Sequence, residues 1–248
     1  MSKSKIEWTD RVWNPISGCS KVSAGCKNCY AETYAHRFWG ARKFTDIMLH
    51  QDKLNYPLTV KKPTMFFVNS MSDLFHEEVP KDFIESVFEV MNSAEQHTFQ
   101  VLTKRPERMK EIVNEWENKF GMNKNIWFGV SVEDNKSVDR IRFLKDTKAE
   151  VKFISIEPLL ENLTAIKVYS WEIDWVIIGC ESGMKRRECE LRWVTNLVDY
   201  FENKGIPIFV KQLSIDGKVE KDINKFPKDL QIREYPKLNQ NTSEEKTK

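Results

Sequence analysis

Short runs of β-branched and aromatic residues recur along the chain, and each run ends in a group of polar residues. Apolar runs of this length, without polar alternation, are typical of strands buried on both faces of a sheet. Six runs have this pattern, at 65–69, 98–103, 126–132, 151–156, 174–179 and 206–210. One more strand is expected near 12–16. The sequence therefore predicts six or seven strands.

Helical patterns lie between most of these strands. In 81–95 the apolar residues Phe83, Val87 and Met91 recur at helical spacing, which predicts one buried face. Further helices are expected at 31–39, 106–120 and 190–204, with a weaker pattern at 137–147 and a loop or short helical turn at 158–172. Gly205 is a suitable left-handed stop for the helix before it.

The spacing from strand to strand is that of a βα unit, which favours parallel pairing. Repeated βα units predict an α/β fold, a full or partial TIM-like barrel, with an open doubly wound sheet as the alternative. We expect a single barrel domain over 1–226, with a cysteine loop at 14–34. A C-terminal extension covers 227–248, and its polar composition predicts disorder from about residue 236.

Composition excludes several classes of protein. Of 248 residues, 40% are hydrophobic and 31% are charged, which excludes a disordered or collagenous chain. No apolar run approaches the ~20 residues that span a bilayer. The charged N-terminus has no apolar core of a signal peptide, so we expect a cytoplasmic protein with no membrane partner. The net charge of +2 neither indicates nor excludes a local basic patch.

Three of the five cysteines crowd into the loop after the first expected strand. Cys19, Cys26 and Cys29 have the spacing C-x6-C-x2-C and precede an expected helix. Three thiolates on one loop can hold three corners of a 4Fe-4S cluster and leave the fourth iron open to an exchangeable ligand. A zinc site with His36 as fourth ligand is the alternative, although His36 lies roughly 10 Å along the helix from Cys29. A metal-free trio is the third interpretation.

Polar residues that follow the predicted strands form the remaining candidates. Because the carboxyl ends of parallel barrel strands share one rim, these side chains are expected to converge there. They are Asn69, Ser70, Ser72, Asp73, Lys104, Ser131, Glu133, Glu157, Glu181, Lys211 and Gln212. Strand ends are also polar where they meet solvent, and Lys104 or Arg105 is expected to form a rim ion pair with Glu133 or Glu157.

Several of these blocks occur together in a known family. The segments 18–32, 69–76, 102–106, 129–133, 157–160 and 211–212 resemble those of the phage and prophage three-cysteine-motif family, over nearly the whole chain up to about Phe226. That family has no assigned function, and its cysteine loop and barrel look like those of divergent radical S-adenosylmethionine (SAM) enzymes. Two features depart from these patterns: the first cysteine gap is three residues longer than usual, and Cys180 stands where the family has glycine.

The resemblance implies a 4Fe-4S cluster on the three cysteines, with SAM on its open iron. A reductant such as flavodoxin or ferredoxin would drive SAM cleavage to a 5'-deoxyadenosyl radical. On this basis SAM is expected to contact Asn69, Ser70, Ser72, Asp73, Lys104, Ser131 and Glu133. Glu157, Glu181, Lys211 and Gln212 are placed nearer the substrate as catalytic candidates. The substrate is not identified, and a nucleic acid or nucleotide is one candidate.

A second function remains open, a zinc-stabilised nucleic-acid-binding or nuclease-associated module without SAM chemistry. Its surface would combine aromatic and basic residues, namely Trp8, Trp13, Arg37, Trp39, Arg42 and Lys43, although burial of the aromatic rings is the preferred interpretation. His76 is read as an exposed loop histidine or a proton relay. Cys180 and Cys189 are read as a small apolar filler and a surface thiol, or as a radical-quenching thiol.

Overall fold

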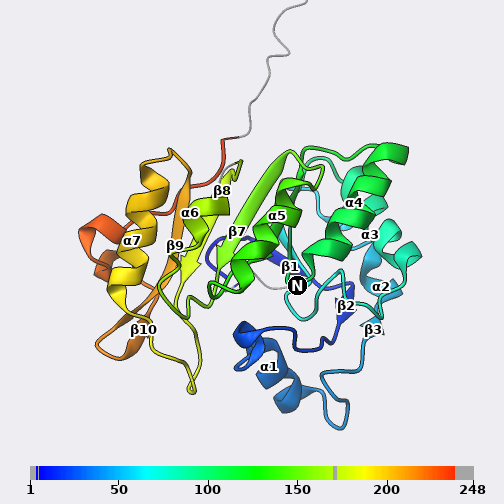
Figure 1. Ribbon diagram of the computed structural model, residues 1–248. Coiled ribbons are helices and arrows are strands. Elements are labelled where there is room, and N and C mark those ends of the chain that lie inside the picture. The colour runs from blue at the N-terminus through cyan, green and yellow to red at the C-terminus, as the bar shows by residue number, and fades with distance from the viewer. Residues whose placement is uncertain (1–3, 5, 170–171, 238–248) are drawn as a thin grey trace, which may run out of the picture.

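The computed structural model describes residues 4, 6–169 and 172–237. An eight-stranded sheet runs through the molecule, and a two-stranded sheet lies near the N-terminus (Figure 1). The strands are β1 Arg11–Trp13, β2 Ile16–Ser17, β3 Met48–Leu49, β4 Met65–Val68, β5 Thr98–Thr103, β6 Ile126–Ser131, β7 Val151–Ile156, β8 Trp175–Gly179, β9 Ile208–Ile215 and β10 Lys218–Glu220. The helices are α1 Tyr30–Phe38, α2 Gln51–Leu54, α3 Lys81–Ser93, α4 Pro106–Phe120, α5 Arg140–Lys145, α6 Ile166–Tyr169 and α7 Leu191–Glu202.

The large sheet follows the order β1-β4-β5-β6-β7-β8-β9-β10. All pairs from β1 to β9 are parallel, and β10 pairs with β9 in the antiparallel sense. Sequential order confirms the predicted parallel α/β fold, and it rules out the doubly wound alternative, in which the strand order reverses. Within the described residues β1 does not pair with β10, so the large sheet is open between these two edge strands.

The strand expected at 12–16 divides into two. β1 pairs with β4, whereas β2 pairs with β3 in the small sheet. Pro15 lies between β1 and β2, and its missing N–H interrupts the hydrogen-bond ladder. Strands β4 to β8 and the long helices lie where the sequence predicts them, whereas β9 begins at Ile208 and continues to Ile215, beyond the predicted end at 210. The short elements β3, β10 and α2 were not predicted. α6 is the short turn expected within 158–172, and Gly205 has the expected positive φ, +67°.

Each face of the large sheet is covered by a different apolar layer. Helices α3, α4, α5 and α7 pack on one face and form the main core. The opposite face carries an aromatic cluster of Trp8, Phe67, Trp127, Phe153, Trp175 and Phe209. Its central ring, Trp175, lies 5.7 Å from the ring centroid of Phe153 and 5.9 Å from that of Trp127. This cluster fills the amino-terminal half of the face.

Polar residues occupy the carboxyl-terminal half of the face that carries the aromatic cluster. Successive side chains of a strand point to opposite faces, so every second residue after Trp127 returns to the face of the aromatic cluster. These residues are Gly129, Ser131 and, just past β6, Glu133. Glu157 follows from Phe153 and Glu181 from Trp175 by the same count. The polar residues at the strand ends therefore share one face, beyond the aromatic rings.

The C-terminal extension is described up to Lys237. Its chain runs beside β9, where the Val210 N–H donates to Ile232 O at 2.9 Å and the Glu234 N–H donates to Ile208 O at 2.8 Å. The tail predicted to be disordered from about residue 236 falls mostly on 238–248, outside the described residues. No helix in the described ranges is long and apolar enough to cross a membrane.

Replacing the central ring of the aromatic cluster tests its contribution to stability. Trp175→Ala is expected to lower the free energy of unfolding by about 3–5 kcal/mol, because a large buried cavity replaces the indole. Met184→Ala, at a side chain that is 98% exposed, is the control and is expected to change it by less than about 0.5 kcal/mol. Urea denaturation followed by tryptophan fluorescence measures both, and equal effects would contradict a structural role for the cluster.

Candidate functional site

The cysteine loop leaves β2 and ends at α1. Gly18 has φ +102°, and a Cβ there would lie 2.4 Å from Asp46 O, so this position requires glycine. The Cys19 N–H donates to Phe44 O at 2.9 Å. Cys26 ends a 3-10 turn, Ala24–Cys26, and Cys29 is the residue before the first turn of α1. All three thiols are free and partly exposed.

Each thiol lies beside a hydrogen-bond donor. Arg105 Nη1 is 3.7 Å from Cys19 Sγ, and Ser23 Oγ is 3.8 Å from Cys26 Sγ. Burial and the nearby Asp73 carboxylate raise the pKa of Cys19 to about 11. Burial also raises the pKa of Cys29, although backbone N–H groups at the start of α1 donate to its sulfur and oppose the shift. In the free protein these two thiols carry their protons, and the donors are in place for thiolates when a metal displaces them.

Asp73 holds the guanidinium that approaches Cys19. The carboxylate accepts hydrogen bonds from Thr103 Oγ1 at 2.7 Å and from the Lys104 N–H at 3.1 Å. Arg105 Nη1 donates to it at 3.2 Å. Arg105 also donates to Ser20 Oγ at 2.9 Å, so the arginine is fixed between the end of β5 and the cysteine loop. Asp73 is thus a positioning group with its oxygens already occupied.

Glu133 joins the cysteine loop to the ends of β5 and β6. Its side chain is completely buried, with Lys104 Nζ 3.1 Å from Oε1 and Arg140 Nη1 2.7 Å from Oε2. Ser23 Oγ donates to Oε1 at 2.6 Å. Burial alone would raise the pKa of Glu133, but the charges of Lys104 and Arg140 outweigh it and hold the pKa below its usual value. The predicted rim ion pair of Lys104 with Glu133 is confirmed, whereas Arg105 pairs with Asp73 and Glu77.

Glu181 binds the same loop from the end of β8. Asn28 Nδ2 donates to its Oε2 at 3.0 Å, and the Arg187 N–H donates to the same oxygen at 2.7 Å. Arg187 Nη1 also donates a hydrogen bond to Ala24 O at 2.9 Å. Burial alone would raise the pKa of Glu181, and the bonds from Arg187 and Asn28 hold it below its usual value. The cysteine loop is therefore attached to both β6 and β8.

Glu157 and Lys211 form a separate ion pair, with Nζ 2.8 Å from Oε1. The register of β8 and β9 passes from Ile178 opposite Val210 to Gly179 opposite Gln212, so Lys211 is the extra residue of a bulge. A bulge redirects the side chain that it carries. A Cβ at Gly179 would lie 2.8 Å from Glu157 Oε1, so glycine leaves the space that this carboxylate occupies.

Most of the other predicted residues make hydrogen bonds within the protein, and Asn69 keeps one polar atom without a partner in the described structure. Ser70 Oγ donates to Asn14 at 3.2 Å, and Ser72 Oγ donates to Ile16 O at 3.0 Å, so both hydroxyls fasten the loop after β4 to the N-terminal strands. Asn69 has φ +62° and accepts the Ile16 N–H at 3.3 Å, while its buried Nδ2 has no partner in the described structure. Ser131 is 3% exposed. Gln212 Nε2 donates to Cys180 O, away from the cysteine loop.

Two expectations about individual side chains are wrong, and a third is confirmed. His76 is 2% exposed, because its Nε2 contacts Ser20 Oγ at 2.8 Å and its Nδ1 accepts the Glu78 N–H. Cys189 is 3% exposed and is no surface thiol, since it packs into the main core with Cys180. Trp8 and Trp13 are buried as preferred, which removes two of the rings from the proposed nucleic-acid surface.

The partners of the predicted carboxylates are functional residues that were not predicted from the sequence. Arg140 and Arg187 neutralise Glu133 and Glu181, and Asn28 links Glu181 to the cysteine loop. Arg140 follows Glu133 by seven residues and Arg187 follows Glu181 by six. Such short separations were the available signal, since a buried carboxylate needs a nearby cation.

The thiols suit an iron–sulfur cluster better than one zinc ion. Zinc–sulfur bonds of ~2.3 Å would bring the sulfurs of one tetrahedral site to within about 4 Å of each other. Among the described residues no three His, Cys, Asp or Glu side chains are grouped to hold a single ion. A cuboidal cluster accepts three wider-spaced thiolates on one loop and needs no fourth protein ligand. The donor set of Cys19, Cys26 and Cys29 fits such a cluster.

One family model matches almost the whole chain. The family model described as protein of unknown function (DUF5131) matches residues 3–242. The chain belongs to this family. The prediction that the chain belongs to a family without an assigned function is confirmed. The phage origin stays a prediction. No curated protein matches the sequence of this DUF5131 protein.

Two solved structures share the fold of the DUF5131 chain. Spore photoproduct lyase complexed with dinucleoside spore photoproduct gives a TM-score of 0.50 at 11% identity, covering 72% of this chain and 57% of that chain. A double mutant of this lyase with bound AdoMet and dinucleoside spore photoproduct gives 0.51 at 10% identity, covering 81% and 63%. The chain thus spans about three fifths of their length. At 10–11% identity this likeness supports the parallel α/β fold.

The Glu133 contacts predict two graded effects on the cysteine loop. Ser23→Ala removes one hydrogen bond to a charged group and is expected to lower the free energy of unfolding by about 1–3 kcal/mol. Glu133→Gln leaves Lys104 and Arg140 without their counter-charge and is expected to lower the free energy of unfolding by about 3 kcal/mol or more. Hydrogen exchange is expected to rise in 18–30 for both variants, but at the end of β6 only for Glu133→Gln. Unchanged exchange in 18–30 in both variants would contradict the attachment.

Proposed function

We propose that this protein is a radical SAM-type enzyme that holds a 4Fe-4S cluster on Cys19, Cys26 and Cys29. The observation that carries the proposal is the attachment of a three-thiol loop to the rim of a parallel sheet. That rim gathers charged side chains on one face, and catalytic sites of parallel barrels lie at this end. When bound, such a cluster would supply the electron for reductive cleavage of SAM to a 5'-deoxyadenosyl radical, and a protein such as flavodoxin or ferredoxin would reduce the cluster.

We assign the binding of SAM to the residues nearest the cysteine loop. The buried Nδ2 of Asn69 has no partner in the described chain and offers a donor to a carboxylate. Ser131 offers a buried hydroxyl and Lys104 offers a cation to the carboxylate of SAM, while Glu133 holds Lys104 in position. Ser70, Ser72 and Asp73 shape this part of the rim through their loop contacts.

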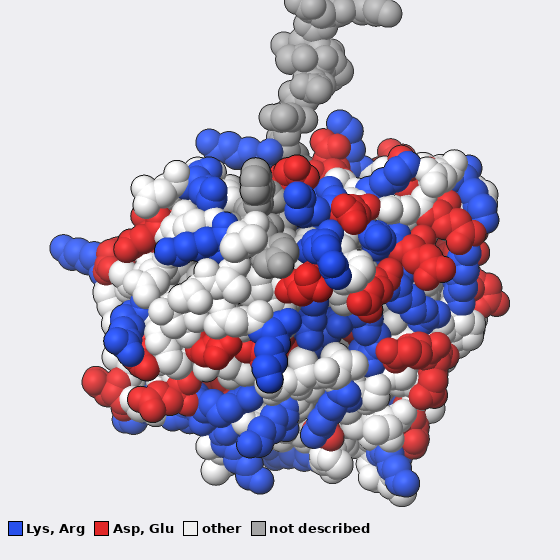
Figure 2. Space-filling view, viewed as in Figure 1, with Lys and Arg blue, Asp and Glu red and all other residues white. Residues whose placement is uncertain are grey.

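The substrate-facing part of the rim is assigned to the later strands. Glu157, Lys211 and Glu181 are the candidate catalytic groups, and Gln212 supports the chain beside Cys180. A nucleotide or nucleic acid is the proposed substrate class, since the structural neighbours are described with a dinucleoside ligand. Figure 2 shows Lys and Arg side chains gathered toward the lower edge of the view, where Figure 1 places α1 and the loop before α7. A polyanion would be attracted to that edge.

Metal analysis and SAM turnover test the proposal. Protein purified without oxygen is expected to be brown, to contain about four irons and four sulfides, and to release 5'-deoxyadenosine when SAM and dithionite are added. Electron paramagnetic resonance of the reduced protein should change when SAM is added, because its amino and carboxylate groups would become ligands of the open iron. A colourless protein that retains stoichiometric zinc would refute it.

Cysteine substitutions separate the proposed ligands from the other thiols. Cys19→Ala, Cys26→Ala and Cys29→Ala are each expected to lose most of the iron and at least about a hundredfold of the 5'-deoxyadenosine yield, because each removes one ligand. The matched control, Cys189→Ala, removes a buried thiol outside the loop and is expected to keep its iron. Iron loss in the control alone would locate the cluster elsewhere.

A further inference from the structure

Helix α1 buries its small side chains and exposes its large ones. Of its nine residues only Ala31 and Ala35 are buried, and both pack with Phe44. The partly buried Cys19 and Cys29 adjoin this small cluster. An amphipathic helix ordinarily does the reverse, because most of its stability comes from burial of its large apolar side chains. Packing within the protein therefore does not account for the outer face of α1.

Three aromatic rings lie along this outer face. Tyr30, Tyr34 and Phe38 recur every four residues and are 52%, 51% and 57% exposed. The Tyr30 hydroxyl donates to Ser70 O at 2.6 Å, which fixes that ring at the start of the helix. The ring centroids of Tyr34 and Phe38 lie 4.5 Å apart, and the rings are tilted by 41°. Where the structure describes side chains, three of the five exposed Phe, Tyr or Trp residues thus lie on one helix.

Unpaired cations lie in the same segment as the rings. Residues 21–46 carry five Lys or Arg and two Asp or Glu, a net charge of +3, whereas the whole chain has +2. Lys27, Arg37 and Lys43 form no ion pair with any described residue. Arg37 Cζ lies 5.2 Å from the centroid of the Phe38 ring. Figure 2 shows Lys and Arg gathered at the edge of the molecule where Figure 1 places α1.

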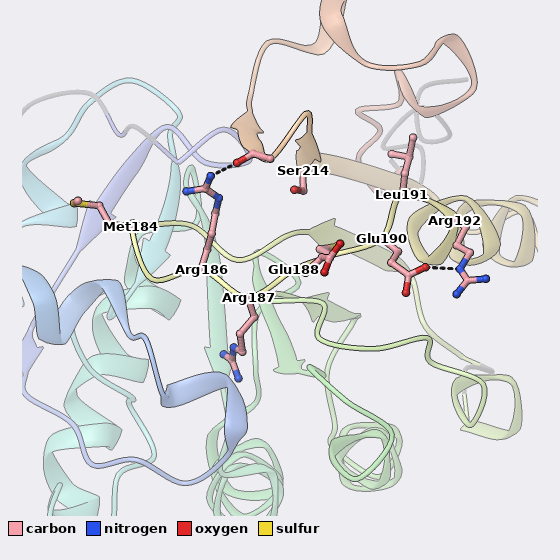
Figure 3. Close-up of a pocket in the computed structure, with 10 residues that line it drawn as sticks. Met184, Arg186, Arg187, Glu188, Glu190, Leu191, Arg192 and Ser214 are labelled. Atoms are coloured by element: carbon pink, nitrogen blue, oxygen red, sulfur yellow. Dashed lines mark hydrogen bonds and ion pairs between the residues drawn. The ribbon is translucent and has the colours of Figure 1, made fainter.

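The loop before α7 adds positive charge on the side of the cysteine loop. Asn28 Nδ2 donates to Lys185 O at 2.8 Å, so segment 182–187 lies beside the residues that precede α1. This segment carries three cations and no carboxylate, and its Met184 side chain is 98% exposed. Figure 3 shows Arg187 of the segment pointing toward the cysteine loop, to which it donates a hydrogen bond. The positive charge of α1 and of this loop therefore borders the candidate site.

We propose that the outer face of α1 binds single-stranded nucleic acid, with bases stacked on Tyr34 and Phe38 and phosphates paired with Lys27, Arg37 and Lys43. Exposed rings beside cations are the means by which proteins hold single strands without reading their sequence. A duplex does not fit these rings, because its paired bases present only their edges to a protein. An acidic protein would match the cations, but its carboxylates offer no flat face to the rings.

The position of α1 brings the bound strand to the candidate site. The helix begins directly after Cys29, and its buried alanines pack next to that cysteine. A strand that lies along Tyr34 and Phe38 and continues toward segment 182–187 passes the cysteine loop. The role of this strand as the substrate rests on the proposed function, whereas its binding needs neither a cluster nor SAM.

Fluorescence anisotropy of a labelled oligothymidylate of about 12 nucleotides measures the binding. The full-length protein is used without SAM or reductant. We expect saturable binding that weakens about tenfold or more between about 50 and 200 mM salt, because the phosphate contacts release counterions. An abasic strand of equal length keeps the phosphates and lacks the bases, so it is expected to bind at least about fivefold more weakly. Equal affinity for the two strands would overturn the proposal.

Single substitutions separate stacking from charge. Phe38→Ala removes a ring and no charge, so it is expected to weaken oligothymidylate binding at least about fivefold and to leave the abasic strand unaffected. Arg37→Gln is expected to weaken both strands alike and to reduce the salt dependence. The matched control, Phe120→Ala, removes an exposed ring at the end of α4 and is expected to bind as the wild type does. Equal losses in Phe38→Ala and Phe120→Ala would overturn the assignment to α1.

Circular dichroism checks the fold of each variant, and Tyr34→Ala replaces Phe38→Ala if that variant fails to fold. The wild-type preference for oligothymidylate over the abasic strand decides the proposal even without a variant. A dimer in sedimentation that Phe38→Ala dissociates would show that a second copy of the chain covers α1, and it would overturn the proposal.

The outcomes distinguish this inference from the proposed function. SAM cleavage without strand binding would overturn the inference and leave the proposed function in place. Strand binding by a protein that holds zinc instead of iron would support the inference and refute the proposed function.

Discussion

The buried carboxylate of Glu133 organises the end of the sheet on which the candidate site lies. A charge removed from water must be matched by opposite charge and hydrogen bonds, or the fold loses several kcal/mol. Lys104 from the end of β5, Arg140 from α5 and Ser23 from the cysteine loop together supply that match. Three separate parts of the chain are therefore fixed to one another by a single group, and the thiols take their place from that arrangement.

The same face of the sheet combines two opposite environments. Its amino-terminal half is filled by aromatic rings around Trp175, and its carboxyl-terminal half carries paired charges. Low dielectric below the rim strengthens each ion pair above it, because fewer waters screen the charges. Periodicity along β6, β7 and β8 produces this division, and on β9 Lys211 lies two residues after Phe209 at the register shift. The charged residues of the candidate site therefore lie next to a buried aromatic cluster on the same face of the sheet.

Much of the fold follows from the sequence because its signals are local. Continuous apolar runs locate β4 to β8, and helical spacing of Phe83, Val87 and Met91 locates α3. The pairing of Lys104 with Glu133 follows from neighbouring strand ends. The missed features are those that depend on the meeting of distant loops or on local backbone irregularity. The hydrogen bond between Asn28 and Glu181 joins residues that are 153 positions apart in the sequence. Pro15 separates β1 from β2, although the apolar pattern predicts one continuous strand there.

The separation of these contacts along the chain orders the assembly of the site. Ser23 meets a partner 110 residues later, and Asn28 meets one 153 residues later. During synthesis the thiols emerge long before the groups that hold their loop, and domains fold largely once their chain is complete. The loop is then an unsupported thiol-rich segment on the growing chain. The contacts of the cysteine loop with Glu133 and Glu181 are consequently among the last of the site to form, after β8 has joined the sheet.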